Sequence, residues 1–201
     1  MKSEKEKMLL GTPYKAFGDE LKDERLRARK LTHQYNHLAP GEATEEQKIL
    51  RELLGTTGEQ FVIEAPFRCD YGYNIHIGEN FYANFNLVIL DCAEVIIGKN
   101  ALIGPDVGIY TAGHPVHPDL RNQDYEFAFP VKIGNSVWIG GHVVINPGVT
   151  IGDNVVIGSG SVVTKDIPSG VIAMGNPCQV LREITDEDRN YYFKKLRFDE
   201  G

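Results

Sequence analysis

An aliphatic side chain returns every six residues between positions 133 and 163, and this period limits the fold more than any other feature. An α-helix would scatter positions six apart around its circumference, and a strand alternates with a period of two. A three-sided parallel β-helix explains the spacing, because six residues make one side of a turn and point one aliphatic side chain inward. Glycine follows four of the six repeat positions, which are Ile133, Ile139, Ile145, Ile151, Ile157 and Val163. Gly, Asn and Asp near the corners tolerate the left-handed backbone that tight corners use.

The same period is present at Ile97, Ile103 and Ile109, and we expect the coil to span residues 61–185. It is interrupted by "YTAGHPVHPDLRNQDYEFAFP", so we predict an extended loop at 110–132. A long excursion from a compact solenoid is usually functional.

The segments on either side of the coil have a different composition. Residues 1–60 are rich in charge and helix formers, and they predict an N-terminal helical segment with two helices separated by Pro40 and Gly41. Thr44 is the expected N-cap of the second helix, and Gly55 its end. Residues 186–201 predict a C-terminal helix or tail. The fold class is therefore mainly β.

Charge and composition narrow the class of protein. The net charge of −7 at pH 7 argues against nucleic-acid binding, because phosphate backbones need a basic face. The beginning of the chain has no signal-peptide pattern, and no apolar run reaches the length of a membrane span. We expect Cys69, Cys92 and Cys178 to be reduced, which is typical of a cytoplasmic protein that binds neither nucleic acid nor membrane.

The chain resembles the hexapeptide-repeat acyltransferases, and within them the maltose and galactoside O-acetyltransferases, almost from end to end. The resemblance depends on "RLRARKLTHQYNH", "FRCDYGYNIHIG", "NFYANFNLVILD", "YTAGHPVHP", "VWIGGHVVINPGVTIGDNVVIGSGSVVTKDIP" and "GNPC". It implies a left-handed parallel β-helix and a homotrimer with active sites between subunits. It also implies acetyl-CoA as co-substrate, a sugar hydroxyl as acceptor, and no metal.

Acetyl transfer from a thioester to a hydroxyl needs a general base, which a histidine supplies well near neutral pH. His114 in "AGHPV" matches the family's catalytic histidine and is the expected base. His117 could replace it as base, or pair with it around a metal, although we expect it to be a structural residue of the loop. Glu126 is the expected carboxylate that orients the His114 ring.

The resemblance also implies residues for the acceptor. Asn84 matches a family residue at the acceptor site, where an amide can both donate to and accept from sugar hydroxyls. Asp70 and Asp91 would bind further hydroxyls, and Tyr82 would stack on a sugar ring. Where the family has an N-terminal aspartate, this chain has Ala16.

The acetyl-CoA side would lie in the last coils. A glycine there would let the pantetheine arm approach the backbone, and cations would meet the nucleotide phosphates. The expected contacts are Gly141, Ser159, Thr164, Lys165 and Arg182.

Two other functions remain open from the sequence alone. Trimeric coils can hold zinc between subunits, as in hydratases that resemble carbonic anhydrase, and His114, His117 and His142 would then be the ligands. A non-catalytic binding coil is the other alternative, but such a coil needs no interruption of its repeat.

Overall fold

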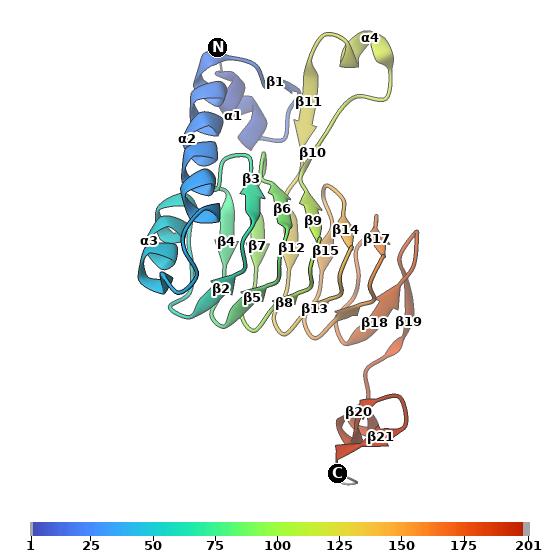
Figure 1. Cartoon of the computed structure of the whole chain (residues 1–201). Helices are drawn as coiled ribbons and strands as arrows, with labels where there is room; N and C mark the ends of the chain where they lie inside the picture. Colours follow the sequence, from blue (N-terminus) through green and yellow to red (C-terminus); the bar gives the residue numbers. More distant parts are fainter. Residues whose placement is uncertain (1, 199–201) are drawn as a thin grey trace.

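Three parallel sheets form the sides of a coil, which confirms the parallel β-helix predicted from the six-residue period (Figure 1). The structure is a computed structural model that describes residues 2–198. Face 1 is the sheet of β2 (Phe61–Ile63), β5 (Phe81–Ala83), β8 (Leu102–Ile103), β13 (Trp138–Ile139), β16 (Val156–Ile157) and β18 (Val171–Met174). The strand β19 (Gln179–Glu183) ends this sheet and is antiparallel to β18. Face 2 is β3 (Phe67–Cys69), β6 (Leu87–Leu90), β9 (Gly108–Tyr110), β14 (Val144–Ile145) and β17 (Val162–Val163). Face 3 is β4 (Ile75–Ile77), β7 (Val95–Ile97), β12 (Val131–Ile133) and β15 (Thr150–Ile151).

The aliphatic repeat positions stack in register inside the coil. On face 3, Ile97 pairs with Ile133, and Ile133 pairs with Ile151. These side chains are at most 3% exposed, and they belong to one continuous core. Burial of such a column stabilises the fold by about 25 cal/mol for each Å² of apolar surface removed from water.

The corners use the left-handed backbone that the composition predicted. Non-glycine residues with positive φ recur at equivalent positions of successive turns at two of the three corners, and most of them have a short polar side chain. Between faces 3 and 1 they are Asn80, Asn100, Ser136 and Asn154, and between faces 1 and 2 they are Asn86, Asp106 and His142.

The excursion leaves the coil at the corner between faces 2 and 3. Ile97 and Ile133 are neighbours in the sheet although 36 positions separate them, whereas only 18 separate Ile133 from Ile151. The additional residues form β10 (Ala112–Gly113), α4 (Pro118–Arg121) and β11 (Tyr125–Ala128), and β10 and β11 pair as antiparallel strands. The predicted loop is thus an ordered hairpin that rises from the coil (Figure 1).

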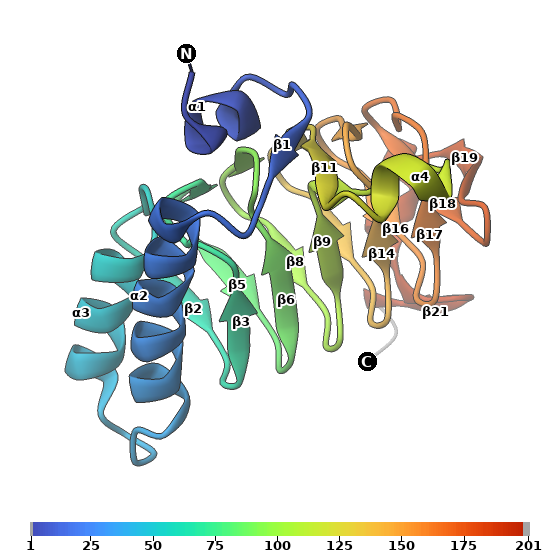
Figure 2. The ribbon, with the colours of Figure 1, turned by 90° about the horizontal axis from the view of Figure 1, so that it is seen from above.

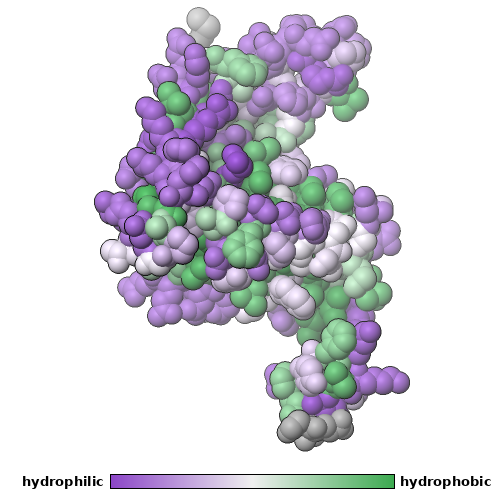
Figure 3. All heavy atoms as spheres, viewed as in Figure 1, coloured by the Kyte–Doolittle hydropathy of each residue, from purple (hydrophilic) through white to green (hydrophobic). Residues whose placement is uncertain are grey.

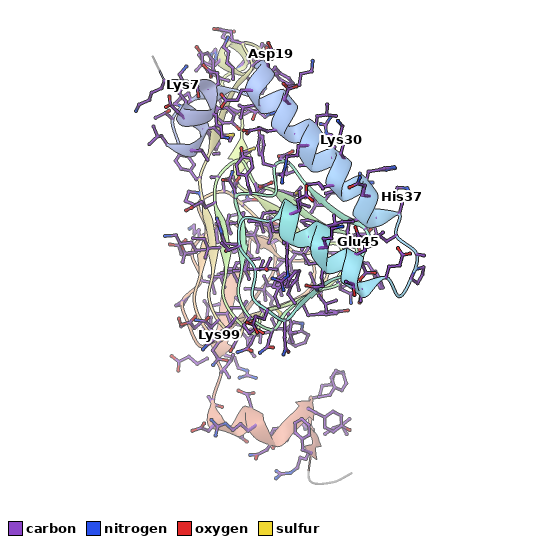
Figure 4. The ribbon with its side chains drawn as sticks, turned by 90° about the vertical axis from the view of Figure 1, so that its left-hand side faces the viewer. Lys7, Asp19, Lys30, His37, Glu45 and Lys99 are labelled. Carbon is purple, nitrogen blue, oxygen red and sulfur yellow. The ribbon has the colours of Figure 1, made fainter. Side chains whose placement is uncertain are left out.

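The N-terminal segment covers the first turns of the coil. The two predicted helices are α2 (Asp19–Asn36) and α3 (Ala43–Leu53), and a shorter helix, α1 (Glu4–Leu9), precedes them. Glu42, not Thr44, is the N-cap residue of α3. Figure 4 shows α2 running along the side of the coil from Asp19 to His37. Strand β1 (Tyr14–Lys15) leaves this layer and pairs with β11 of the excursion.

The predicted C-terminal helix is wrong for the described residues. The segment forms a five-residue 3₁₀ helix, η1 (Asp186–Asn190), and a hairpin of β20 (Tyr191–Phe193) and β21 (Leu196–Arg197). A capping box of Thr185 and Asp188 starts a helical turn, but the aromatic residues that follow favour extended backbone. The hairpin projects away from the coil, and hydrophobic side chains are visible on it (Figures 1 and 3). No helix among residues 2–198 is long and apolar enough to cross a membrane.

Candidate active site

His114 lies directly after β10, at the base of the excursion, and its side chain is exposed. Its Nδ1 atom is 3.3 Å from the backbone carbonyl oxygen of Tyr125 on β11. A carbonyl only accepts, so this contact places the proton of a neutral ring on Nδ1. The Nε2 atom is then left as the basic nitrogen, which is the arrangement that a general base requires.

His117 has a local role in the same hairpin. It is the N-cap residue of α4, and its Nδ1 accepts from the backbone N–H of Asp119 at 3.2 Å. Its ring therefore supports the tip of the excursion.

Glu126 is one residue away from the carbonyl that contacts His114, but its own carboxylate has a different partner. The hydroxyl of Tyr14 donates to Glu126 Oε2 at 2.7 Å, and Tyr14 faces Glu126 across the β1–β11 pair. Tyr14 is completely buried. The ring of His114 is thus held by the backbone of β11, and the Glu126 side chain is held by the N-terminal segment.

Asp91 is completely buried in the corner between faces 2 and 3. Its carboxylate accepts the backbone N–H groups of Asp70 at 3.0 Å and Tyr71 at 2.8 Å. Burial raises its pKa to about 7, although the backbone hydrogen bonds act in the opposite direction. In the single chain this carboxylate has no surface to offer a sugar, and what it does is hold the corner that carries Asp70.

Asp70 is half-buried at this corner, directly after β3. Burial raises the pKa of its carboxyl, while the thiol of Cys92, 3.6 Å from Oδ2, and the charge of Arg25 lower it. Asp70 is therefore a partly accessible carboxylate on the same edge of the coil as the excursion.

A second group of predicted residues lies on another edge, between faces 1 and 2. Asn84, Gly141 and Ser159 lie on this edge after β5, β13 and β16, and the level that follows β8 separates Asn84 from Gly141. The Asn84 side-chain oxygen accepts the N–H of Phe85 at 2.8 Å, which leaves its NH₂ group free to donate. A Cβ at Gly141 would lie 3.2 Å from the carbonyl oxygen of Pro105, so the corner is closely packed there. Tyr82, on β5, points outward from face 1 and is half-buried.

The last three predicted acetyl-CoA contacts, Thr164, Lys165 and Arg182, have different surroundings. Thr164 and Lys165 follow β17 on the edge between faces 2 and 3, and both are exposed. Arg182, on β19, is paired through both terminal nitrogens with Asp188, at 2.8 and 2.7 Å. This pairing raises the pKa of Arg182 and lowers that of Asp188 below its usual range. A phosphate group would have to compete with Asp188 for the guanidinium.

The predicted residues thus form two half-sites on one chain. The base half-site contains His114, Asp70 and Lys165 on the edge between faces 2 and 3, and the glycine half-site contains Asn84, Gly141 and Ser159 on the edge between faces 1 and 2. Face 2 separates them. A hollow of about 630 Å³ lies beside α2, and another of about 620 Å³ lies around Arg182, but His114 lines neither.

The three histidines of the zinc alternative have separate partners in the chain. His142 Nε2 is 3.6 Å from Asp106 Oδ2, whereas His114 and His117 have the contacts described above. Within residues 2–198 of one chain, no three His, Cys, Asp or Glu side chains are grouped so that they could hold a metal ion.

The sequence analysis missed Tyr14 and Cys92 as neighbours of the site. Tyr14 lies in a segment without a repeat, and the Cys92 thiol had no partner in sequence to indicate its contact with Asp70. A single tyrosine near the N-terminus carries no signal that it will bond to a residue of the excursion.

The comparisons with known proteins agree with this architecture. The maltose acetyltransferase hexapeptide capping motif matches residues 7–58, and the bacterial transferase hexapeptide (six repeats) matches residues 130–165. Galactoside O-acetyltransferase of Escherichia coli (strain K12) is 50% identical over 177 residues, which are 88% of this chain and 87% of that protein.

Two solved structures extend the comparison to three dimensions. A galactoside acetyltransferase in complex with coenzyme A has a TM-score of 0.95 and 49% identity, over 98% of both chains. A maltose O-acetyltransferase from Clostridium difficile 630 has a TM-score of 0.91 and 52% identity, over 92% of this chain and 99% of that one. Because half of the residues are identical over nearly the whole length, this chain belongs to the maltose and galactoside O-acetyltransferases of the hexapeptide-repeat acyltransferase family.

Proposed function

We propose that this protein transfers an acetyl group from acetyl-CoA to a sugar hydroxyl, with His114 as the general base. The observation that carries the proposal is the Nδ1 contact of His114 with the Tyr125 carbonyl, because it leaves Nε2 as the basic nitrogen at the base of the excursion. The relatives support the reaction class: one is a galactoside acetyltransferase in complex with coenzyme A, and another is a maltose O-acetyltransferase.

The chemistry then runs in one displacement. His114 Nε2 takes the proton of the acceptor hydroxyl while the oxygen attacks the thioester carbon. The C–S bond breaks, the sulfur of CoA leaves, and it takes up the proton from the imidazolium. The products are an O-acetyl sugar and CoA, and the histidine returns to its neutral form. Proton transfer by a positioned base contributes about 10²–10⁴-fold to such a rate.

The acceptor would be bound by polar groups from both half-sites. Asp70 is partly accessible and can accept sugar hydroxyls, and the free NH₂ group of Asn84 can donate to one. Tyr82 has an outward ring on face 1 for the apolar side of a sugar. The names of the relatives favour a maltose or galactoside type of acceptor.

Acetyl-CoA would lie along the later turns of the coil. The backbone N–H of Gly141 would donate to the thioester oxygen. Ser159 and Thr164 offer hydroxyls, and Lys165 offers an exposed charge for a phosphate. Arg182 would serve the same phosphates after exchanging Asp188 for them.

A homotrimer would join the two half-sites, with the base half-site of one chain facing the glycine half-site of the next. Face 1 supports this assembly, because its outward positions form one apolar ladder in register: Val62, Tyr82, Leu102, Trp138, Val156 and Ile172. Trp138 is 55% exposed in the single chain, which is unusual for a tryptophan that no partner covers. The outward positions of face 3 are instead His76, Ile96, Lys132 and Thr150, and three of these four are polar.

The reaction would take place in the cytoplasm. The three cysteines are free in the structure, and free thiols are typical of a reducing compartment.

The test is release of free thiol from acetyl-CoA in the presence of a panel of sugars, with His114→Ala beside His117→Ala. Both changes remove an exposed imidazole of the same hairpin, but only His114 would act as base. We expect His114→Ala to lower kcat by about 10²–10⁴-fold with little change in acetyl-CoA binding, and His117→Ala to keep most of the activity. Near-normal turnover in His114→Ala would refute the proposed base.

A further inference from the structure

The N-terminal arm, residues 4–16, builds a second small core apart from the core of the coil. This core joins the arm to α2, to the corner between faces 2 and 3, and to the base of the excursion. Its buried members are Met8, Tyr14, Ala16, Leu21, Tyr71, Cys92, Ala93 and Ala128, with Ala112 packed against them. Figure 2 shows α1 and β1 beside β11. Since Ala112 and Ala128 are on the two strands of the excursion, the arm packs on the hairpin that carries His114.

Tyr14 is the polar residue of this core that reaches the excursion. It is completely buried, and its hydroxyl donates to Glu126 Oε2 at 2.7 Å. Burial raises the pKa of Tyr14 far above its usual value, with smaller contributions from Cys92 and Glu126, so the phenol stays a neutral donor. A buried donor to a carboxylate is stronger than a neutral pair in water.

The same neighbourhood reaches the acceptor carboxylate. The Cys92 thiol, near Tyr14, donates to Asp70 Oδ2 across 3.6 Å. The two accessible carboxylates of this region, Glu126 and Asp70, are therefore both held by neutral buried donors.

We propose that Tyr14 is a positioning residue for acetyl transfer, which acts by fixing the Glu126 carboxylate and with it the β11 backbone that orients the His114 ring. This inference rests on the proposed function of His114. Two contacts tie β11 to the arm at one place, the hydroxyl bond and the β1–β11 pairing of Tyr14 with Glu126 and Lys15 with Tyr125. Tyr125 is the residue whose carbonyl holds His114 Nδ1. The fixed Glu126 carboxylate would also favour the imidazolium that forms during transfer.

The chain offers a matched control for this bond. The hydroxyl of Tyr73 donates to Glu24 Oε2 at 2.6 Å, and Tyr73 packs against the same small core. Tyr73→Phe therefore removes a tyrosine–carboxylate bond of the same kind, but the carboxylate belongs to Glu24 on α2 and not to a residue of the excursion.

The experiment compares kcat and KM of Tyr14→Phe and Tyr73→Phe in the thiol-release assay, with their melting temperatures. We expect similar small losses of melting temperature, because each variant loses one part-buried hydrogen bond between a tyrosine hydroxyl and a carboxylate. We expect kcat to fall about 10-fold in Tyr14→Phe alone, with the KM for acetyl-CoA unchanged, since loss of an orienting partner typically lowers activity 10–100-fold. Equal kcat values in the two variants would overturn the assignment.

A double-mutant cycle tests whether Tyr14 acts through Glu126. If it does, Tyr14→Phe has no further effect on kcat when Glu126 is already Gln. A full, independent 10-fold loss in the Glu126→Gln background would overturn the route through Glu126. His114→Ala is measured in the same series. Loss of turnover there, with equal Tyr14→Phe and Tyr73→Phe, overturns the Tyr14 assignment alone, whereas retained turnover in His114→Ala overturns the proposed function and this inference together.

Discussion

Asp91 shows how burial can change the role of a single residue. A carboxylate close to Asp70 on the edge between faces 2 and 3 suggests a sugar contact, but complete burial and backbone N–H donors give Asp91 a supporting role. The corner 70–74 depends on it, because an unpaired buried N–H costs about 1–3 kcal/mol.

This burial makes the stability of the protein depend on pH. The pKa of Asp91 is raised to about 7, from a model-peptide value of about 3.9 in the unfolded chain. Between these two values the folded state binds more protons than the unfolded state, so the free energy of unfolding falls as pH rises from about 4 to about 7. The side chain in Asp91→Asn cannot titrate, so the free energy of unfolding of this variant should lack this dependence on pH.

The measurement is urea unfolding of wild type and Asp91→Asn at a series of pH values and one protein concentration. We expect the free energy of unfolding of wild type, relative to that of the variant, to fall with rising pH by at most about 1.4 kcal/mol per pH unit. Above pH 7 the difference between the two proteins should stay constant. A difference between the two proteins that does not change with pH would show that Asp91 keeps an ordinary pKa in the folded state.

At the scale of the elements, the corners decide how regularly the strands stack. Each strand is only two to four residues long on most turns, so a corner that fails to turn would shift every strand after it. Left-handed backbone at the corners is favourable for glycine and tolerable for Asn and Asp.

Asn154, with φ of 53°, tests this requirement, because it turns the chain between β15 and β16. We expect Asn154→Val to destabilise the protein by about 1–2 kcal/mol, since a β-branched residue is strained at positive φ. Asn154→Gly is the control, and it should unfold at nearly the same urea concentration as wild type. Equal losses in the two variants would mean that the Asn154 side chain, and not the backbone angle, is what matters.

The positions of His114 and Asn84 in the whole molecule are the reason that we propose an assembly of several chains for the reaction. His114 and Asn84 lie on different edges of the coil, separated by face 2. In a closed ring of three identical chains, the edge that carries His114 in each chain can face the edge that carries Asn84 in its neighbour.

Mixed trimers of His114→Ala and Asn84→Ala test this arrangement. The two variants carry different tags, are coexpressed, and are purified through both tags in sequence. If each site uses His114 of one chain and Asn84 of the next, one site in three has both residues, and we expect about one third of wild-type activity. Activity no higher than that of the two separate variants would mean that one chain supplies both residues.

The apolar ladder of face 1 gives a second prediction at this scale. Leu102→Glu puts a charge in the middle of the ladder, where Leu102 is 49% exposed in the single chain. We expect it to abolish the trimer and the activity together, because an unpaired charge is expensive to bury. Ile96→Glu on face 3, at a residue 38% exposed, is the control and should leave both unchanged. The solution mass from light scattering distinguishes the two, and an intact Leu102→Glu trimer would exclude face 1 as the interface.

Features carried by local sequence were predictable. The six-residue period determined the coil and its core, because each repeat position buries its side chain against the equivalent positions of the neighbouring turns, which carry the same pattern. The break in the period determined the place of the excursion, and the histidine at its root followed from the motif.

What the sequence could not determine depends on contacts between distant segments. Tyr14 and Glu126 are 112 positions apart, and only the tertiary structure brings the arm beside the excursion. The burial of Asp91, the pairing of Arg182 with Asp188, and the replacement of the predicted C-terminal helix by a hairpin were likewise decided by packing and local partners. The physical reason is that a periodic pattern specifies which side chains leave water, whereas the partner of a polar side chain is set by whatever the folded chain places within hydrogen-bonding distance.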